Sequence, residues 1–262
     1  MSLKVVTAGL ASKAVEDSIA ELVADKVASR IAAKDFTLWG TEAEAESSIR
    51  LGWVGSAFDS APLVEPILAL RAEFAAKGVN RFVLCGMGGS SLAPEVITGT
   101  AGVELVVLDS TDADQVGAAL AGDLNKTAII VSSKSGSTVE TDSQKRIFEK
   151  AFTDAGIDKT DRVVIVTDPG SPMEAAAKAD GYRIFNADPT VGGRYSALTA
   201  FGLVPSGLAG VDLNELLNEA EAISIDLAVD QPENPGLILG AAIAGTSPLK
   251  NKLALVTDGT HL

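Results

Sequence analysis

Arg81-Phe-Val-Leu-Cys-Gly-Met-Gly-Gly-Ser-Ser91 runs from an apolar stretch into a glycine-rich turn, and helix-compatible sequence follows at residues 92–97. A strand, a tight turn and a helix in this order form the first half of a βαβ unit. Four more short apolar runs follow, with helix-compatible sequence between them, over residues 104–108, 127–131, 162–166 and 182–185. Runs that are apolar throughout are typical of strands buried on both faces. The pattern predicts an α/β fold with a parallel five-stranded sheet flanked by helices, doubly wound with right-handed crossovers, of the flavodoxin-like or Rossmann-like kind.

Helical sequence flanks this α/β region on both sides. Residues 1–80 carry apolar side chains at three- and four-residue steps and are expected to form an amino-terminal helical segment that packs on the sheet. The sheet domain is expected over residues 81–210, with a helical connection over residues 211–250. Within residues 251–262, Lys252-Leu-Ala-Leu-Val-Thr257 has the apolar character of one more buried strand.

This last strand has two interpretations. A parallel strand normally continues into a crossover helix that covers it, and the sequence stops five residues after this one. The first interpretation makes it the first strand of a truncated second α/β unit, so that the chain is a fragment. The second interpretation adds it to the edge of the first sheet.

The composition argues against several classes of site. Lys and Arg number 21 against 35 Asp and Glu, which gives a net charge of −14. A surface with this charge repels nucleic acid and anionic lipid. A single cysteine, Cys85, and a single histidine, His261, exclude a disulfide framework and argue against a metal site, and His261 is interpreted as an ordinary loop residue. No apolar run approaches the ~20 residues of a membrane span. We therefore expect a cytoplasmic protein without cofactor, nucleic-acid partner or membrane partner.

The loops after the strands are where ligands bind in parallel α/β sheets. The first, Gly86-Met-Gly-Gly-Ser-Ser91, offers glycines that let the backbone approach an anion, and the free N–H groups of a helix amino terminus. A dinucleotide site is a competing interpretation, with Asp109 as the ribose-binding acid, although Ser91 replaces the third glycine of G-x-G-x-x-G. A purely structural turn is a third interpretation.

The second loop, Ser132-Ser-Lys-Ser-Gly-Ser-Thr138, concentrates five hydroxyl groups and one ammonium group in seven residues. Neutral hydrogen bonds contribute roughly 1 kcal/mol each and charge-assisted ones roughly 1.5–3 kcal/mol. Three or four such contacts would hold a phosphate monoester at micromolar to millimolar strength without a metal ion. Ser137 and Glu140 have the spacing of a capping box, so Glu140 is interpreted as a structural residue.

The third loop, Val191-Gly-Gly-Arg-Tyr-Ser196, follows the fifth strand. Its two glycines bring the chain close to a neighbouring group, and Arg194 comes directly after them. A plain surface arginine is the alternative interpretation of this segment.

Together, the three loops resemble the phosphoglucose isomerase family, which is built from sugar-isomerase (SIS) domains. The Gly-x-Gly-Gly-Ser loop of the family is similar to residues 86–90, and its Ser-Lys-[Thr/Ser]-x-[Thr/Ser]-Thr-x-Glu-Thr segment is similar to residues 133–141. Ser135, Gly136 and Ser137 depart from the commonest residues of that segment. The Gly-Gly-Arg-Tyr-Ser signature is intact at residues 192–196. The resemblance covers the chain from about residue 80 to its end, and Leu38-Trp-Gly and Arg50-Leu-Gly-Trp53 also resemble a subgroup of shorter bacterial members.

The resemblance implies a role for each matching residue. Those that would hold a sugar phosphate are Ser133, Lys134, Ser135 and Thr138, with Gly89, Ser90 and Gly193 lining the rest of the substrate site. Arg194 would stabilise the negative enediolate that forms when glucose 6-phosphate and fructose 6-phosphate interconvert.

The resemblance also implies groups that this sequence lacks. The family's catalytic base is a Glu on a later helix, and later His and Lys residues assist; none of these motifs occurs here. Glu95 and Glu140 are already explained as first-turn helix acids. The isolated chain is therefore expected to bind sugar phosphate without turning it over, and the full-length parent is expected to be a homodimeric glucose-6-phosphate isomerase.

Two rival functions stay open at this point. A regulatory SIS module would bind a sugar phosphate without chemistry, but it has no need of an enediolate stabiliser such as Arg194. A dinucleotide-binding domain would use Gly86, Gly88 and Asp109 and leave residues 133–138 unexplained.

Overall fold

The computed structural model describes residues 3–257 and contains a five-stranded sheet in the order β2-β1-β3-β4-β5, with all strands parallel. The strands are β1 Arg81–Gly86, β2 Val106–Leu108, β3 Thr127–Ser132, β4 Val163–Thr167 and β5 Arg183–Asn186. Each overlaps one predicted apolar run, and the predicted α/β fold class is confirmed. The order is that of a flavodoxin-like doubly wound sheet.

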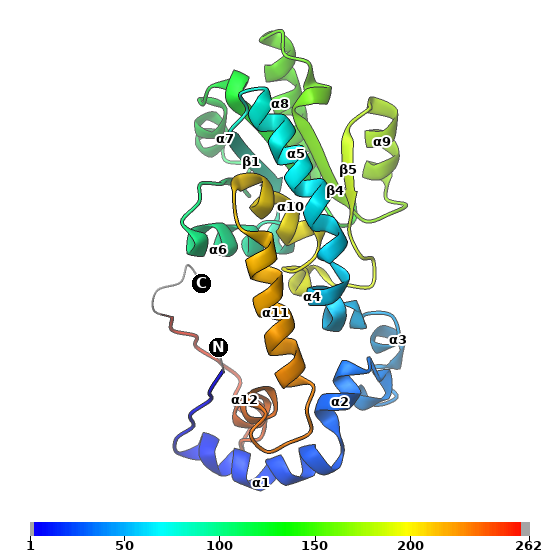
Figure 1. Ribbon diagram of the computed structural model, residues 1–262, viewed down its shortest axis with the longest axis vertical. Coiled ribbons are helices and arrows are strands. Elements are labelled where there is room, and N and C mark those ends of the chain that lie inside the picture. The colour runs from blue at the N-terminus through cyan, green and yellow to red at the C-terminus, as the bar shows by residue number, and fades with distance from the viewer. Residues whose placement is uncertain (1–2, 258–262) are drawn as a thin grey trace. The chain divides into compact units, whose positions relative to one another are not determined.

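Helices cover both faces of the sheet (Figure 1). One face packs against α7 Ala113–Leu120, α8 Val139–Asp154 and α9 Pro172–Asp180. The other packs against α10 Ala200–Ala209, which in turn contacts α5 Val64–Ala76 and α6 Leu92–Ala101. Since helices bury both faces, every residue of β3 and β4 is buried, as the apolar runs predicted.

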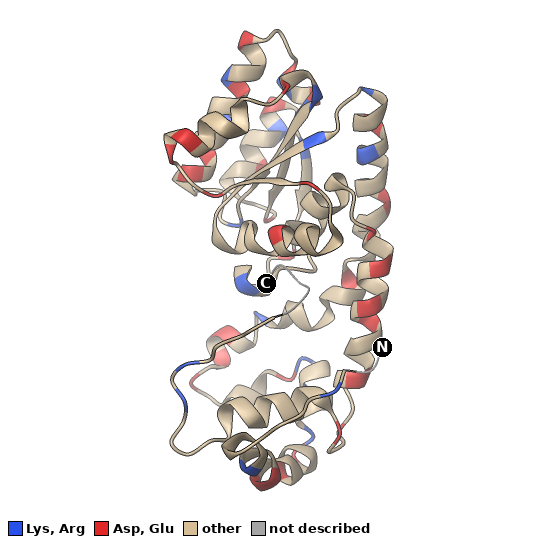
Figure 2. Ribbon diagram, turned by 90° about the vertical axis from the view of Figure 1, so that its left-hand side faces the viewer, with Lys and Arg blue, Asp and Glu red and all other residues tan. Residues whose placement is uncertain are grey.

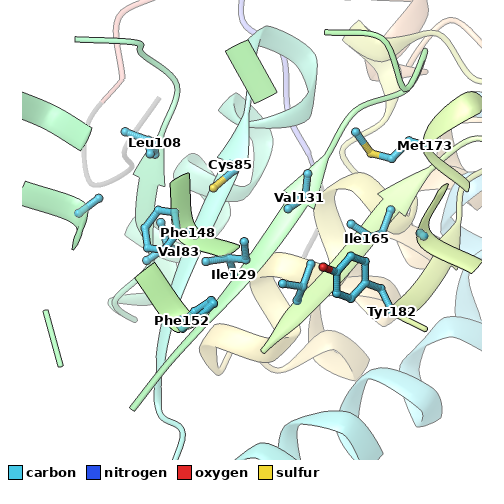
Figure 3. Close-up of a cluster of buried hydrophobic side chains, with 13 residues drawn as sticks. Val83, Cys85, Leu108, Ile129, Val131, Phe148, Phe152, Ile165, Met173 and Tyr182 are labelled. Carbon is cyan, nitrogen blue, oxygen red and sulfur yellow. The ribbon is translucent and has the colours of Figure 1, made fainter. Parts of the chain in front are cut away.

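The core between the sheet and its α7–α8–α9 face holds alternate residues of the central strands (Figure 3). Ile129 and Val131 of β3 point to this face and meet Phe148 and Phe152, which lie one turn apart on α8. Both phenylalanines are 0% exposed. Full burial of each such side chain contributes roughly 1.5–3 kcal/mol, so α8 is fixed firmly at the site described below.

The chain divides into two compact units. The sheet unit comprises residues 59–214 and 257–262, of which the structure describes the chain to residue 257. The helical unit comprises residues 1–58 and 215–256, and its helices include α1 Leu10–Ala24, α2 Val27–Ala32, α3 Glu44–Ser47 and α12 Pro235–Ala244, with most of α11 Leu213–Leu227. Here α1 packs against α12. This grouping differs from the predicted boundaries: α5 belongs with the sheet, whereas the first 58 residues belong with the carboxy-terminal helices.

Residues 252–257 form neither strand nor helix, contrary to the predicted strand. Leu253, Leu255 and Val256 are 61%, 79% and 95% exposed. A strand is stable only when its N–H and C=O groups pair with a neighbour, and in the described part of the chain none pairs with this run. The interpretation as an edge strand of the first sheet is therefore wrong, and a second SIS domain stays a prediction. His261 lies outside the described residues.

Charged residues lie mainly on the helices and loops, and the strands contain few of them (Figure 2). The strands of the described chain include two charged residues, Arg81 and Arg183, each the first residue of its strand. From residue 3 to residue 257, no helix is long and apolar enough to cross a membrane. The same residues contain no group of three or more His, Cys, Asp or Glu side chains placed to hold a metal ion.

Candidate functional site

The carboxyl ends of β1 and β3 mark the point where the strand order reverses. β1 and β3 are neighbours, with Gly86 in register with Ser132, yet β2 lies on one side of them and β4 on the other. The connections that leave β1 and β3 therefore run in opposite directions, which is the point where doubly wound sheets bind their ligands. The first two predicted loops follow these two strands.

The loop after β1 fits tightly against two neighbours. A Cβ atom on Gly86 would lie 3.0 Å from the Ser90 carbonyl oxygen and 3.3 Å from that of Ser132. A Cβ atom on Gly89 would lie 2.6 Å from the Gly193 carbonyl oxygen. Ser196 Oγ donates to that same oxygen over 2.7 Å and approaches the Gly89 carbonyl oxygen at 3.3 Å. The structure thus brings the first and third predicted loops together, with half-buried Ser90 beside their contact.

In the loop after β3, the hydroxyl of Ser133 turns inward. Ser133 is 2% exposed, its Oγ accepts from the Gly136 N–H over 3.2 Å, and it lies 3.1 Å from Thr138 Oγ1. When Ser133 donates to Thr138, the Thr138 proton is free for another acceptor. Ser133 therefore shapes the loop, and half-buried Thr138 is the hydroxyl of the pair that a ligand can reach.

The tip of this loop requires its glycine. Gly136 has φ +68°, and a Cβ atom there would lie 2.9 Å from Met173 Cβ at the start of α9. The departure of this residue from the family pattern therefore has a steric reason. On either side, Ser135 and Ser137 are exposed, and Ser137 donates through both its N–H and its hydroxyl to Ser135 Oγ.

The predicted capping box of Ser137 and Glu140 is wrong. The N-cap of α8 is Thr138, and no side chain caps the helix. The first N–H groups of a helix have no partner within the helix and carry its partial positive charge. The amino terminus of α8 therefore presents backbone donors beside the Ser135 and Thr138 hydroxyls, an arrangement suited to a phosphate group.

Arg194 lies in the short 3₁₀ turn η7 Gly193–Tyr195, which the Ser196 hydroxyl anchors to the loop after β1. Its side chain is exposed, and it makes no ion pair with any residue from 3 to 257. An unpaired guanidinium at the carboxyl edge of the sheet is available to an anionic ligand.

Lys134, which is expected to hold the phosphate, makes an ion pair with another loop. Its ammonium lies 2.5 Å from Asp168 Oδ2, in the loop after β4, and 3.5 Å from the Pro189 carbonyl oxygen, in the loop after β5. Sequence reasoning missed Asp168, because the ion pair joins residues 34 positions apart. Its position directly after a buried strand was the signal that could have revealed it.

Three other groups are poorly placed for chemistry. Glu95 lies in the first turn of α6 and Glu140 in that of α8, as expected of helix-stabilising acids. Cys85 is buried within β1, and burial raises the pKa of its thiol to about 12, so it is no nucleophile.

The chain also contains an apolar cavity of about 1030 Å³, but it lies within the helical unit and not at the sheet. Its lining includes Leu22, Ile31, Trp53, Phe58 and Leu237, and none of the described residues that line it is charged. A cavity of this kind does not suit a phosphate dianion, because its charge would be left without a partner.

Comparison with known proteins supports the resemblance. The family model described as phosphoglucose isomerase matches residues 71–245. A protein of Haloarcula marismortui named probable glucose-6-phosphate isomerase is 36% identical over 163 residues, which are 61% of this chain and 37% of that protein. A glucose-6-phosphate isomerase of Thermus thermophilus is 36% identical over 178 residues, 66% of this chain and 42% of the relative. The chain thus spans about two fifths of the length of these relatives.

Among solved structures, a glucose-6-phosphate isomerase from Chlamydia trachomatis superposes with a TM-score of 0.61 at 27% identity, over 76% of this chain and 37% of that one. The match extends over most of this chain, so the fold agrees with that of a solved member of the family.

Proposed function

Because this chain belongs to the phosphoglucose isomerase family, we propose that it forms the sugar-phosphate-binding part of a glucose-6-phosphate isomerase. Its substrate would be glucose 6-phosphate or fructose 6-phosphate, bound at the carboxyl ends of β1 and β3. The observation that carries the proposal is the arrangement of three loops: those after β1 and β3 follow neighbouring strands, and the turn that bears Arg194 packs against the loop after β1.

The phosphate is held by the loop after β3. The hydroxyls of Ser135 and Thr138 and the open N–H groups of α8 supply neutral donors to its oxygens. Ser133 and Lys134 set the course of that loop. Gly89, Ser90 and Gly193 line the sugar end of the site.

Arg194 stabilises the reacting centre. Aldose–ketose isomerisation moves a proton between neighbouring carbons through an enediolate, whose negative oxygen needs a preorganised donor. Removal of one such donor typically lowers the rate by about 10²–10³. This role favours an enzyme over a regulatory module, which has no enediolate to stabilise.

The isolated chain binds sugar phosphate but does not turn it over. None of its acids matches the family's catalytic Glu: Glu95 and Glu140 are first-turn helix acids, and Asp168 is paired with Lys134. Assembly of the full-length parent as a homodimer, and its cytoplasmic location, stay predictions.

Calorimetric titration with fructose 6-phosphate tests the site. We expect saturable binding in the micromolar to millimolar range, which the double variant Ser135→Ala/Thr138→Val loses. The matched control is Thr153→Val, which removes a hydroxyl at the far end of the same helix, where it bonds only to the Glu149 carbonyl oxygen. The control should bind as the unchanged chain does.

Two results would contradict the proposed site. If the double variant binds as tightly as the unchanged chain, the phosphate is not held by the loop after β3. If NADH instead binds and quenches or enhances fluorescence in a saturable way while fructose 6-phosphate does not bind, the dinucleotide-binding alternative is correct.

A further inference from the structure

The ion pair between Lys134 and Asp168 connects three neighbouring loops at the carboxyl edge of the sheet. Lys134 belongs to the loop after β3, Asp168 to the loop after β4, and Pro189, whose carbonyl oxygen is 3.5 Å from the ammonium, to the loop after β5. The two side chains are 25% and 17% exposed, so the pair is partly shielded from water. One ammonium group thus connects the loops that follow β3, β4 and β5.

The Asp168 carboxylate depends on this partner. Its Oδ2 is 2.5 Å from the Lys134 ammonium, whereas its Oδ1 is buried and has no hydrogen-bond partner among residues 3–257. A carboxylate with one oxygen shut off from water is costly unless a cation compensates its charge. The ammonium is therefore held strongly where it is.

A second contact ties the same two loops together. Thr167 Oγ1 donates to the Ser133 carbonyl oxygen over 2.7 Å, and the Ser133 N–H donates to the Val166 carbonyl oxygen over 3.0 Å. These bonds fix the first residue of the loop after β3. The ion pair fixes its second residue, Lys134, from the side chain.

We propose that Asp168 is a positioning residue of the phosphate site: it holds the Lys134 ammonium, and so fixes the loop after β3, while the phosphate is bound by hydroxyls and backbone N–H groups and not by that ammonium. This inference rests on the proposed function and distinguishes the groups that bind the phosphate from those that position the loop. It reverses the obvious assumption that the single lysine of the loop binds the phosphate directly.

The two arrangements predict opposite changes in ligand affinity for the substitution Asp168→Asn. If the ammonium bound the phosphate, Asp168 would compete for it and add a negative charge near the ligand, so Asp168→Asn would tighten binding. If the ion pair positions the loop, Asp168→Asn keeps the shape of the side chain, weakens the pair and therefore weakens binding.

The experiment is a calorimetric titration of fructose 6-phosphate into Asp168→Asn, Lys134→Met and the double variant. We expect affinity to fall about tenfold in Asp168→Asn, because a loop displaced by a fraction of an ångström loses part of every contact. The double variant should bind no more weakly than Lys134→Met, because both lack the same pair. Equal or tighter binding by Asp168→Asn, or a double variant weakened by the product of the two single effects, would overturn the inference.

A matched control separates positioning from general destabilisation. Glu149 pairs with Lys145 over 2.7 Å, with side chains 14% and 13% exposed, and it also accepts from Tyr182, which precedes β5 at the opposite end of the strands. Glu149→Gln should lower the melting temperature by a similar amount and leave the affinity for fructose 6-phosphate unchanged. If Glu149→Gln weakens binding as much as Asp168→Asn does, the ion pair at the site has only a structural role.

Hydrogen exchange of the unliganded protein tests the pair independently of any ligand. Amides of residues 134–138 should exchange faster in Asp168→Asn than in the unchanged chain, while those of β3 should not. If the unchanged chain binds no fructose 6-phosphate, the proposed function fails, and this exchange alone decides the positioning role. Unchanged exchange at residues 134–138 would overturn it.

Discussion

The sheet unit and the helical unit bury their apolar residues to very different degrees. The twelve largest fully buried side chains of the described residues, Phe148 and Ile130 among them, all lie in the sheet unit. In the helical unit the buried apolar residues are mostly alanines, with Leu217 and Leu237 as the larger ones in the described chain. Apolar side chains such as Ile225 stay 62% exposed there.

The most stable part of the chain, the sheet unit, is therefore also the part that carries the candidate binding site. Burial of apolar surface is the main favourable term in folding, so the sheet unit supplies most of the free energy of unfolding. Two loops of the candidate site follow the central strands β1 and β3, whose residues are almost all buried, and the third follows the edge strand β5. A rigid sheet can hold such loops in position, as preorganised binding requires.

The largest expected effect is that the two units unfold separately. Both tryptophans of the chain, Trp39 and Trp53, belong to the helical unit. In a urea titration, tryptophan fluorescence should therefore change at a lower urea concentration than the main loss of far-ultraviolet circular dichroism. Coincident transitions by the two probes would mean that the units unfold as one and would remove the basis of the comparison.

A Leu→Ala substitution should lower the free energy of unfolding far more in the sheet unit than in the helical unit. Leu84 of β1 is 0% exposed, whereas Leu239 of α12 is 48% exposed. Leu84→Ala should lower the free energy of unfolding by about 2–5 kcal/mol, and Leu239→Ala by less than about 1 kcal/mol. Native-state hydrogen exchange at the slowest amides of β3 and of α12 measures each. Similar losses at both positions would contradict the comparison.

Within the sheet unit, the loop after β1 packs against the turn that bears Arg194. An added methyl group should lower stability at Gly89 but not at Gly193. Gly89→Ala places a Cβ atom 2.6 Å from the Gly193 carbonyl oxygen and should destabilise by about 1–3 kcal/mol through overpacking. Gly193→Ala is the matched control, because its Cβ atom would meet nothing within 4 Å. Urea unfolding compares the two variants; equal stability would show that the loops are not packed as described.

The smallest effect concerns a carboxyl group beneath the loop after β4. Hydrogen bonds from Lys178, from the Gly170 N–H and from Asn186 lower the pKa of Glu174 from 4.5 to about 2. A pKa lowered by folding adds stability that is complete above pH 4.5 and is lost as the pH falls towards 2. Glu174→Gln should therefore melt at a lower temperature than the unchanged chain at pH 7, and the difference should shrink between about pH 4.5 and about pH 2. A difference that stays constant over this range would exclude the carboxylate as its cause.

The sequence predicted the sheet well, because its strands are apolar runs bounded by glycines and polar residues. The sequence did not predict features that depend on contacts with residues far away in the chain. Residues 252–257 have the composition of a strand but pair with no other described strand. The grouping of the amino-terminal helices with the carboxy-terminal ones rests on contacts such as that of the Ser29 N–H with Asp230, 201 positions apart.

In the candidate site too, the sequence did not reveal contacts between residues that lie far apart in the chain. Local motifs found the three loops; strand register brings the first two together, and the contacts of Gly193 and Ser196 with Gly89 bring the third to the first. The inward turn of Ser133 and the attachment of Lys134 to Asp168 depend on side chains that no spacing rule connects. The false capping box arose because Ser137 has the right spacing, while the helix begins one residue later, after Thr138.

Hydrogen exchange with and without fructose 6-phosphate shows whether the sugar phosphate binds at the loops of the sheet unit, because it reports where a ligand binds. We expect slower exchange in residues 86–91, 133–139 and 192–196 of the sheet unit, and no change in the helical unit. Protection confined to α1, α12 and the apolar cavity of the helical unit, or no protection anywhere at saturating ligand, would contradict this expectation.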